Sequence, residues 1–381
     1  MKNIEIYYPN KLVFGMNCLD QMSEDFIKLG LTRLFLITAP FIIKKHSGVF
    51  EKLKSKGISI NINLDINQEP TFSDFDKIIS DANDFKADCI AGIGGGSILD
   101  IAKIVAALLY SNIEIKDVVG NGLLKKRKTH LICIPTTSGT GSEVSPNSIL
   151  YDEEDQLKKG IISPCLVPDN VYVDPNLTMS LPPEITAYTG VDALTHCIEA
   201  YTNKNSHPII DNIALEGINL ISNNLKTAFD DGNDIESRSK LALGSMYGGM
   251  CLGPVNTAAV HALAYPLGGE YKIPHGLSNA LLLPYVMEFN LDADVKRYSK
   301  IALAMGADEG DNDRQTALNG IIQIKKLMNN CKLPVKLSDI EISYNAIEKI
   351  AQSAMKVERL LKNNIKEITL NDAITIYKSA Y

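Results

Sequence analysis

The first half of the chain alternates short apolar runs with longer segments of helical periodicity. Runs of four to eight apolar, often β-branched residues are typical of buried strands. They occur as LTRLFLIT (31–38), ISINI (58–62), ADCIAGIG (87–94), HLICIPT (130–136) and VYVD (171–174). Between them, segments 73–86 and 97–110 repeat apolar residues at intervals of three and four, as helices that pack on one face do. This alternation predicts an α/β domain with a parallel sheet flanked by helices.

The pattern changes at Leu181-Pro182-Pro183, where two prolines interrupt regular structure and β-branched runs become rare. Helical periodicity then dominates, in segments 211–229, 240–250, 279–289, 296–305, 316–329 and 344–361. We therefore expect two domains, an α/β domain over 1–180 and an all-helical domain over 181–381.

Composition excludes two classes of partner. The chain has 381 residues, of which 45% are hydrophobic, and a net charge of −7 without a basic stripe. Nucleic acid and anionic membrane surfaces both require clustered positive charge, so we expect neither as a partner.

The cysteines and the N-terminus indicate a cytoplasmic protein. Seven scattered cysteines show no C-x-x-C spacing and lie mostly in apolar runs, which is typical of reduced, buried thiols. The N-terminal residues alternate like a strand rather than a signal sequence, and no apolar run approaches the roughly 20 residues of a membrane span.

A glycine-rich turn is the first candidate binding element. Gly94, Gly95, Gly96 and Ser97 follow an apolar strand and begin a helix that carries Asp100 and Lys103. Backbone N–H groups at a helix N-terminus bind phosphate, although glycines at such a turn also serve tight geometry alone.

A second candidate follows the 130–136 strand, as Thr136, Thr137, Ser138, Gly139 and Thr140. Its hydroxyl groups can donate to a pyrophosphate or a nicotinamide amide, and open parallel sheets bind ligands where their strands end. Together the two loops predict a Rossmann-like nucleotide site, against the alternative of a flexible polar loop.

The helical half contains a possible metal site. Asp192 and His196 are four residues apart, hence on one face of a helix, although such a pair alone is more often an intrahelical hydrogen bond. His261 and His275 are two of only six histidines, and the stretch between them contains Pro266 and several glycines that we expect to form turns. One carboxylate and three imidazoles suit Fe²⁺ or Zn²⁺ better than Ca²⁺ or Mg²⁺.

Four segments together resemble the signatures of the iron-containing (group III, metal-dependent) alcohol dehydrogenase family. They are GGGSILDIAK (94–103), PTTSGTGSEVS (135–145), GVDALTHCIEAY (190–201) and VHALAYPLGGEYKIPHGLSNALLLP (260–284), in the order that the family has them. The resemblance implies an NAD(P)-dependent oxidoreductase that transfers a hydride between the dinucleotide and a small alcohol or aldehyde.

The resemblance also implies roles for individual residues. Metal ligands fall on Asp192, His196, His261 and His275. Cofactor contacts fall on Gly96 and Ser97 with Asp100, on the loop from Thr136 to Thr140, and on Ile149 and Lys158 in a hairpin-like segment.

Two positions depart from the family's common pattern. Many members carry a second histidine, implicated in proton transfer, where this chain has Tyr265; a tyrosine, with a pKa of roughly 10, relays protons less readily near neutrality. Members that prefer NAD carry an aspartate where this chain has Ala39, so repulsion of a 2′-phosphate is lost and both NAD and NADP stay open.

Two other functions remain as alternatives. Chemistry like that of dehydroquinate synthase needs a cluster of cations for a phosphorylated substrate, and only Lys272 lies near the metal segments. A non-catalytic homologue that binds nucleotide or metal is the other. We also expect a homodimer, in which an exposed strand at Ile4–Tyr8 pairs across a two-fold axis.

Overall fold

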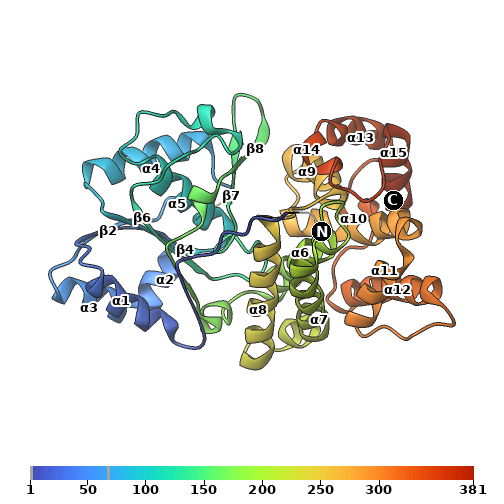
Figure 1. The fold of residues 1–381 in the computed structure, drawn as a ribbon, viewed down its shortest axis with the longest axis horizontal. Coiled ribbons are helices and arrows are strands. Elements are labelled where there is room, and N and C mark those ends of the chain that lie inside the picture. The colour runs from blue at the N-terminus through green and yellow to red at the C-terminus, as the bar shows by residue number, and fades with distance from the viewer. Residues whose placement is uncertain (1–2, 67–68) are drawn as a thin grey trace. The chain divides into compact units, whose positions relative to one another are not determined.

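The computed structural model describes residues 3–66 and 69–381, which divide into two compact units (Figure 1). The sheet unit consists of Ile6–Thr137 and Ser142–Thr178. The helical unit contains Ser138–Gly141 and Met179–Tyr381, together with residues 3–5. The segment Ser138–Gly141 thus leaves the sheet unit and packs within the helical one.

A parallel sheet forms the centre of the sheet unit. Its six strands within the described residues lie in the order β1-β9-β6-β4-β2-β3, and every adjacent pair is parallel. The strands are β1 (Lys11–Phe14), β2 (Arg33–Thr38), β3 (Ser59–Asn63), β4 (Cys89–Gly94), β6 (His130–Pro135) and β9 (Asn170–Val173). The five apolar runs of the sequence correspond to five of these strands, and the predicted α/β fold class is confirmed.

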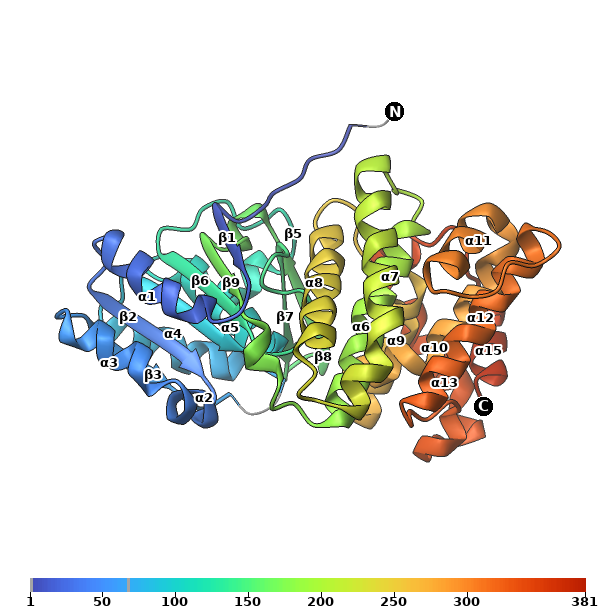
Figure 2. The ribbon, with the colours of Figure 1, turned by 90° about the horizontal axis from the view of Figure 1, so that it is seen from below.

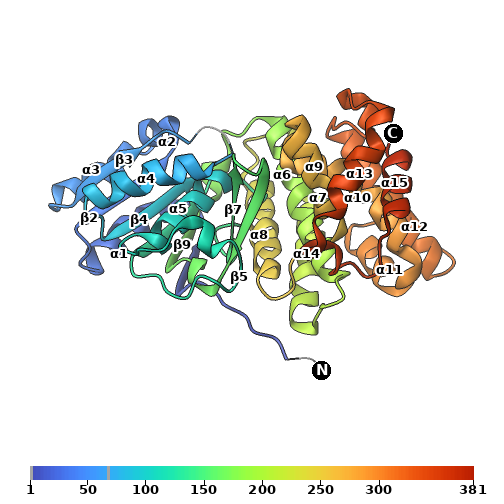
Figure 3. The same ribbon diagram turned by 90° about the horizontal axis from the view of Figure 1, so that it is seen from above.

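Helices cover both faces of this sheet, because its central strands are apolar on both sides. On one face, seen in Figure 2, lie α1 (Cys18–Lys28) and α3 (Ser47–Ser55), with α2 (Pro40–Lys45). On the opposite face, seen in Figure 3, lie α4 (Phe72–Asp84) and α5 (Gly96–Leu108). Each face has its own buried cluster, with Phe26 and Phe50 in one and Phe75 and Val105 in the other.

A smaller sheet adjoins α4 and α5. It contains the antiparallel hairpin of β7 (Asn147–Asp152) and β8 (Leu157–Ile162), with β5 (Gly120–Asn121) beside β8. The backbone N–H of Tyr151 donates to the carbonyl of Pro70 at 2.8 Å, so the loop after β3 is attached to this hairpin. Short 3-10 helices occupy Ile115–Val118, Pro164–Leu166 and Pro175–Thr178.

The helical unit contains no strand among its described residues. Three long helices, α6 (Pro183–Tyr201), α7 (Pro208–Asp230) and α8 (Ile235–Leu252), pack side by side (Figures 1 and 2). The others are α9 (Ala259–Tyr271), α10 (His275–Asn290), α11 (Val295–Ala304), α12 (Asp313–Asn330), α13 (Ile347–Met355), α14 (Glu358–Leu361) and α15 (Leu370–Ser379). Short 3-10 turns lie at Leu291–Ala293, Leu337–Ile340 and Tyr344–Ala346. From Gly190 onward every residue of α6 is buried, which makes it the central helix.

Ile4–Tyr8 pair with no described strand of their own chain, and their pairing with a second copy stays a prediction. Two local expectations were wrong. The stretch around Pro266 is not a series of turns: α9 runs through the proline, and burial of its apolar residues offsets the lost hydrogen bond. The predicted helix 344–361 is divided at Lys356 and Val357, where a β-branched residue leaves the helical backbone region.

The structure bears on two expectations about the compartment. All seven cysteines are free; six are buried and Cys165 is half-buried. None of the described helices combines the length and the apolar character that a membrane crossing needs.

Lys103 is a buried cation that ties α5 to the segment before β7. Its ammonium donates to the carbonyl of Ser142 at 2.7 Å and the hydroxyl of Ser145 at 3.3 Å, and it also contacts the carbonyl of Asn147. Its side chain has no solvent exposure, and burial lowers its pKa, against the attraction of Asp100. Lys103 therefore has a structural role and does not point at a ligand from the helix N-terminus.

Replacing Lys103 with Met tests this role. The substitution keeps the volume but leaves buried carbonyls without a donor, so we expect the free energy of unfolding to fall by about 3 kcal/mol. The measurement is urea unfolding followed by far-UV circular dichroism. Lys52→Met, at a 43% exposed side chain on α3, is the control. Equal effects of the two substitutions would contradict the assignment.

Candidate metal centre

One face of α6 carries three buried polar side chains in an otherwise apolar environment. Asp192, His196 and Glu199 are spaced by four and then three residues, so they project from the same side of the helix. Their exposed fractions are 2%, 5% and 3%. Such burial of ionisable groups requires partners nearby, and α9 and α10 supply them.

The two other histidines predicted as metal ligands come from consecutive helices. His261 lies in the first turn of α9, and His275 is the first residue of α10. Lys272 ends α9 in a left-handed conformation (φ 58°), and Pro274 precedes α10. This sharp connection returns the chain toward α6, so a tight turn between two helices brings the rings together.

The four predicted metal ligands lie together in the structure. The Nε2 atoms of His261, His275 and His196 lie 3.7, 3.8 and 4.0 Å from Oδ1 of Asp192. Two donor atoms that share one ion at about 2.1 Å cannot be more than about 4.2 Å apart, and all three distances meet this limit. Asp192, His261 and His275 also offer ligand atoms within 4.8 Å of one another.

The charges of the cluster favour an ionised aspartate. Burial alone would raise the pKa of Asp192, but the imidazoles of His196, His275 and His261 outweigh it and lower the pKa. Burial lowers the pKa of His196, and Asp192 opposes this effect. Both shifts favour the forms that bind metals, which are the ionised carboxylate and the unprotonated imidazole.

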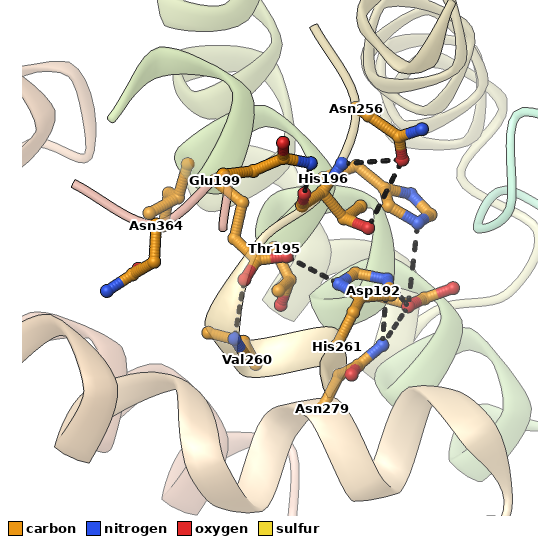
Figure 4. Close-up of polar contacts among 12 residues, drawn as sticks. Asp192, Thr195, His196, Glu199, Asn256, Val260, His261, Asn279 and Asn364 are labelled. Atoms are coloured by element: carbon orange, nitrogen blue, oxygen red, sulfur yellow. Dashed lines mark hydrogen bonds and ion pairs between the residues drawn. The ribbon is translucent and has the colours of Figure 1, made fainter. Parts of the chain in front are cut away.

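Two residues that the sequence analysis did not single out complete the cluster (Figure 4). Asn279, one turn after His275, donates from Nδ2 to Oδ1 of Asp192 at 2.6 Å. Glu199 accepts from the backbone N–H of Val260 at 2.5 Å and lies 2.6 Å from Nδ1 of His261. The signal for both was available, since each is a polar residue three or four positions from a predicted ligand on the same helix.

Tyr265 lies beside the cluster. It is one turn after His261 on α9, and its ring centroid is 6.1 Å from that of His275, with the rings tilted by 60°. The structure thus places a phenol next to a predicted ligand.

The glycine turn lies where the sequence analysis expected it. Gly94 ends β4 and Gly95 is the N-cap of α5, so Gly96 and Ser97 present the first N–H groups of the helix. A Cβ at Gly94 would lie 2.4 Å from the side chain of Ile98. Gly94 is therefore required by close packing of helix on strand, whereas the positions after it offer N–H groups.

The hydroxyl-rich loop divides between the two units. Thr136 follows β6, and its N–H donates to the carbonyl of Gly94 at 2.9 Å, so both loops follow neighbouring strands at one edge of the sheet. Ser138 has a buried hydroxyl without a hydrogen-bond partner among the described residues. The carbonyl of Gly139 faces His196 and favours its protonated form.

Gly141 explains why this loop can approach the helices so closely. Its backbone is left-handed (φ 60°), and a Cβ there would lie 2.3 Å from the Cα of Gly249 on α8. Paired glycines thus allow two backbones to touch, and this contact holds residues 138–141 in the helical unit.

The other predicted cofactor contacts are already bonded within the sheet unit. Asp100 accepts from the N–H of Ile149 at 2.9 Å and from the hydroxyl of Ser142, so both carboxylate oxygens bind the chain itself. Lys158 is paired with Glu69 at 2.6 Å, and its side chain is only 8% exposed. Asp100 and Ile149 lie together, and direct contact of either with a cofactor stays a prediction.

Comparison with known proteins is consistent with this geometry. Residues 9–175 match the family described as "Iron-containing alcohol dehydrogenase", and residues 186–381 match "Fe-containing alcohol dehydrogenase family, C-terminal". These matches cover nearly the whole chain. The chain belongs to the iron-containing alcohol dehydrogenase family, and it is an oxidoreductase of that class, as the sequence resemblance implied.

Relatives within the family differ in the substrates that their names give. Long-chain-alcohol dehydrogenase 1 of Geobacillus thermodenitrificans (strain NG80-2) is 35% identical over 100% of this chain and 98% of its own. A crystal structure of 1,3-propanediol oxidoreductase superposes with a TM-score of 0.96 at 29% identity, covering 100% of both chains. The crystal structure of sulfoacetaldehyde reductase from Bifidobacterium kashiwanohense, in complex with NAD+, superposes with a TM-score of 0.90 at 26% identity, covering 100% of this chain and 99% of that one.

Proposed function

We propose that this protein is a metal-dependent alcohol dehydrogenase and aldehyde reductase that transfers a hydride between NAD(P) and a small alcohol or aldehyde. The observation that carries the proposal is the convergence of three imidazole nitrogens on one oxygen of the buried Asp192. We further propose that residues 1–180 bind the dinucleotide and residues 181–381 hold the metal.

The donor set fits a divalent transition metal. One carboxylate oxygen and three imidazole nitrogens suit Fe²⁺ or Zn²⁺, and Asn279 has a buried Oδ1 without a partner among the described residues. Asp192, His196, His261 and His275 would hold the ion. When bound, such an ion supplies Lewis acidity, which lowers the pKa of an alcohol hydroxyl and polarises a carbonyl.

The two loops of the sheet edge suit a dinucleotide. The N–H groups of Gly96 and Ser97 would bind its phosphates, and the hydroxyls from Thr136 to Thr140 would orient its nicotinamide. The unpartnered hydroxyl of Ser138 supports this assignment, because a buried hydroxyl without a hydrogen bond is costly unless a ligand completes it. The dinucleotide, when bound, accepts or donates the hydride.

Tyr265 or water would move the proton. The Tyr265 ring lies next to His275, and its hydroxyl would act as a relay that takes a proton from a substrate hydroxyl while it passes its own proton to water. We also propose a homodimer, which sedimentation at several protein concentrations would test; a concentration-independent monomer would contradict it.

The function is tested by steady-state oxidation of a primary alcohol series with NAD⁺ or NADP⁺, with added Fe²⁺ or Zn²⁺, followed by absorbance at 340 nm. We expect metal-dependent turnover, and Asp192→Ala should abolish metal retention and turnover together, because it removes the oxygen on which the imidazoles converge. Full activity in that variant would contradict the assignment. A protein that binds dinucleotide and metal but oxidises no alcohol and reduces no aldehyde would instead be a non-catalytic homologue.

Replacing Tyr265 with Phe separates the tyrosine from water as the proton carrier. Positioned general acids and bases contribute about 10²-fold or more, so we expect kcat to fall about a hundredfold while metal content stays unchanged. Tyr271→Phe, at the end of the same helix, is the matched control. An unchanged kcat in Tyr265→Phe would assign the proton to water.

The Lys158–Glu69 pair bears on the choice of dinucleotide. A phosphate that uses Lys158 must share its charge with the Glu69 carboxylate, whose side chain is 41% exposed and lies 2.6 Å from the ammonium. We propose that the Glu69 carboxylate weakens phosphate binding at Lys158, most of all for NADP with its additional phosphate. Glu69 would then supply part of the repulsion that NAD-preferring members obtain from an aspartate at the position of Ala39.

We therefore expect Glu69→Gln to tighten dinucleotide binding, by about fivefold for NADP⁺ and less for NAD⁺, as loss of an ion pair worth up to about 1 kcal/mol allows. Dissociation constants from calorimetry would measure this. Glu154→Gln, which removes a glutamate from the exposed pair with Lys116, is the control. Weaker binding of both dinucleotides to Glu69→Gln would refute the proposal.

A further inference from the structure

Glu199 makes two hydrogen bonds at the start of α9, and both end on groups next to the metal cluster. One carboxylate oxygen accepts from the backbone N–H of Val260 at 2.5 Å, and the other lies 2.6 Å from Nδ1 of His261 (Figure 4). The Glu199 side chain is 4% exposed and that of His261 is also 4% exposed. Both oxygens are therefore occupied in a buried site.

The first contact removes the rotational freedom of the carboxylate. A backbone N–H has one fixed direction and can only donate, so the oxygen that faces Val260 must stay there as an acceptor. The second oxygen is then held against Nδ1 of His261, and an ionised carboxylate can only accept. Nδ1 of His261 is therefore the donor in this contact and carries a ring proton.

The opposite ring nitrogen faces the cluster. Nε2 of His261 lies 3.7 Å from Oδ1 of Asp192 and 3.2 Å from Nδ2 of Asn279. A proton on Nδ1 leaves Nε2 unprotonated, so its lone pair can accept from Asn279 in the metal-free protein and can bind a metal.

We infer that Glu199 is a positioning residue that holds His261 in the Nδ1–H tautomer. In this tautomer the lone pair of Nε2 is available as a ligand to the divalent ion. The inference rests on the proposed metal site and extends it to a residue that need not touch the ion. Glu199 acts through His261, and the hydrogen bond from the backbone N–H of Val260 fixes the orientation of its carboxylate.

The isosteric substitution Glu199→Gln gives a sharp test, because it replaces one acceptor with a donor. The N–H of Val260 cannot become an acceptor, so the glutamine oxygen must stay there and the NH₂ group must face His261. An NH₂ group bonds Nδ1 only when Nδ1 is unprotonated. The proton of His261 is then on Nε2, where it blocks metal binding.

The primary experiment measures the affinity of the full-length protein for Zn²⁺ alone, by competition with a chromophoric chelator. We expect Glu199→Gln to bind Zn²⁺ about 10- to 100-fold more weakly than the wild type, as other partners of metal-bound histidines do when they are replaced. Glu184→Gln is the matched control, since Glu184 is an exposed glutamate in the first turn of the same helix. It should retain wild-type affinity.

A second measurement reads the tautomer directly. In full-length protein with ¹⁵N-labelled histidine rings, the metal-free His261 should show a protonated Nδ1 and an unprotonated Nε2, assigned by comparison with His261→Asn. In Glu199→Gln we expect the two nitrogens to exchange roles. A residue that only supported packing would not produce this exchange, and the wild-type spectrum decides the matter even if the variant does not fold.

The outcomes distinguish this inference from the proposed function. If wild-type protein binds no Zn²⁺, both the metal site and the role of Glu199 are wrong. If the wild type binds Zn²⁺ and Glu199→Gln binds it equally well, or the wild-type His261 carries its proton on Nε2, only the role of Glu199 is overturned.

Discussion

Asp192 has a negative charge in the interior of the helical unit, where 2% of its surface reaches solvent. A buried carboxylate without compensation is expensive, so every element around it must supply a donor or a positive charge. α6 contributes His196, α9 contributes His261, and α10 contributes His275 with Asn279. Each of these three helices thus places a polar partner against Asp192.

A second layer of contacts determines the orientation of the first. Glu199 bonds the start of α9 and the ring of His261 together, and Asn203 bonds the carbonyls of Val255 and Asn256 in the loop before that helix. The N-terminal end of α9 is thus fixed from α6 and from the residues directly after it. Precision in a metal centre depends on such supports, because a long, flexible side chain alone does not hold a ligand atom in place.

In the sheet unit, buried charged side chains hold the loops at the carboxyl ends of the strands in place. Lys103 and Asp100 use their charges within the protein, on the segment that leads from the hydroxyl-rich loop into β7. Gly96 and Ser97 still present N–H groups at the start of α5, and the Ser138 hydroxyl has no partner among the described residues, so these groups can serve a ligand. Among known relatives, names range from long-chain alcohols to sulfoacetaldehyde, which indicates that family membership alone does not define the substrate.

Local pattern was sufficient for most elements of both units, because strand and helix periodicities are properties of the chain itself. The Asp192–His196 spacing, the two further histidines and the family resemblance together pointed to the four metal-ligand candidates, whose role stays a prediction. It was insufficient where the outcome depends on distant partners. Whether α9 tolerates Pro266 depends on burial, and whether Ile4–Tyr8 form a strand depends on a neighbouring strand. Tertiary structure alone likewise decided three side-chain contacts, since a side chain's partner is set by packing and not by its own type. These are the internal hydrogen bonds of Lys103, the pairing of Lys158 with Glu69, and the position of Glu199 between Val260 and His261.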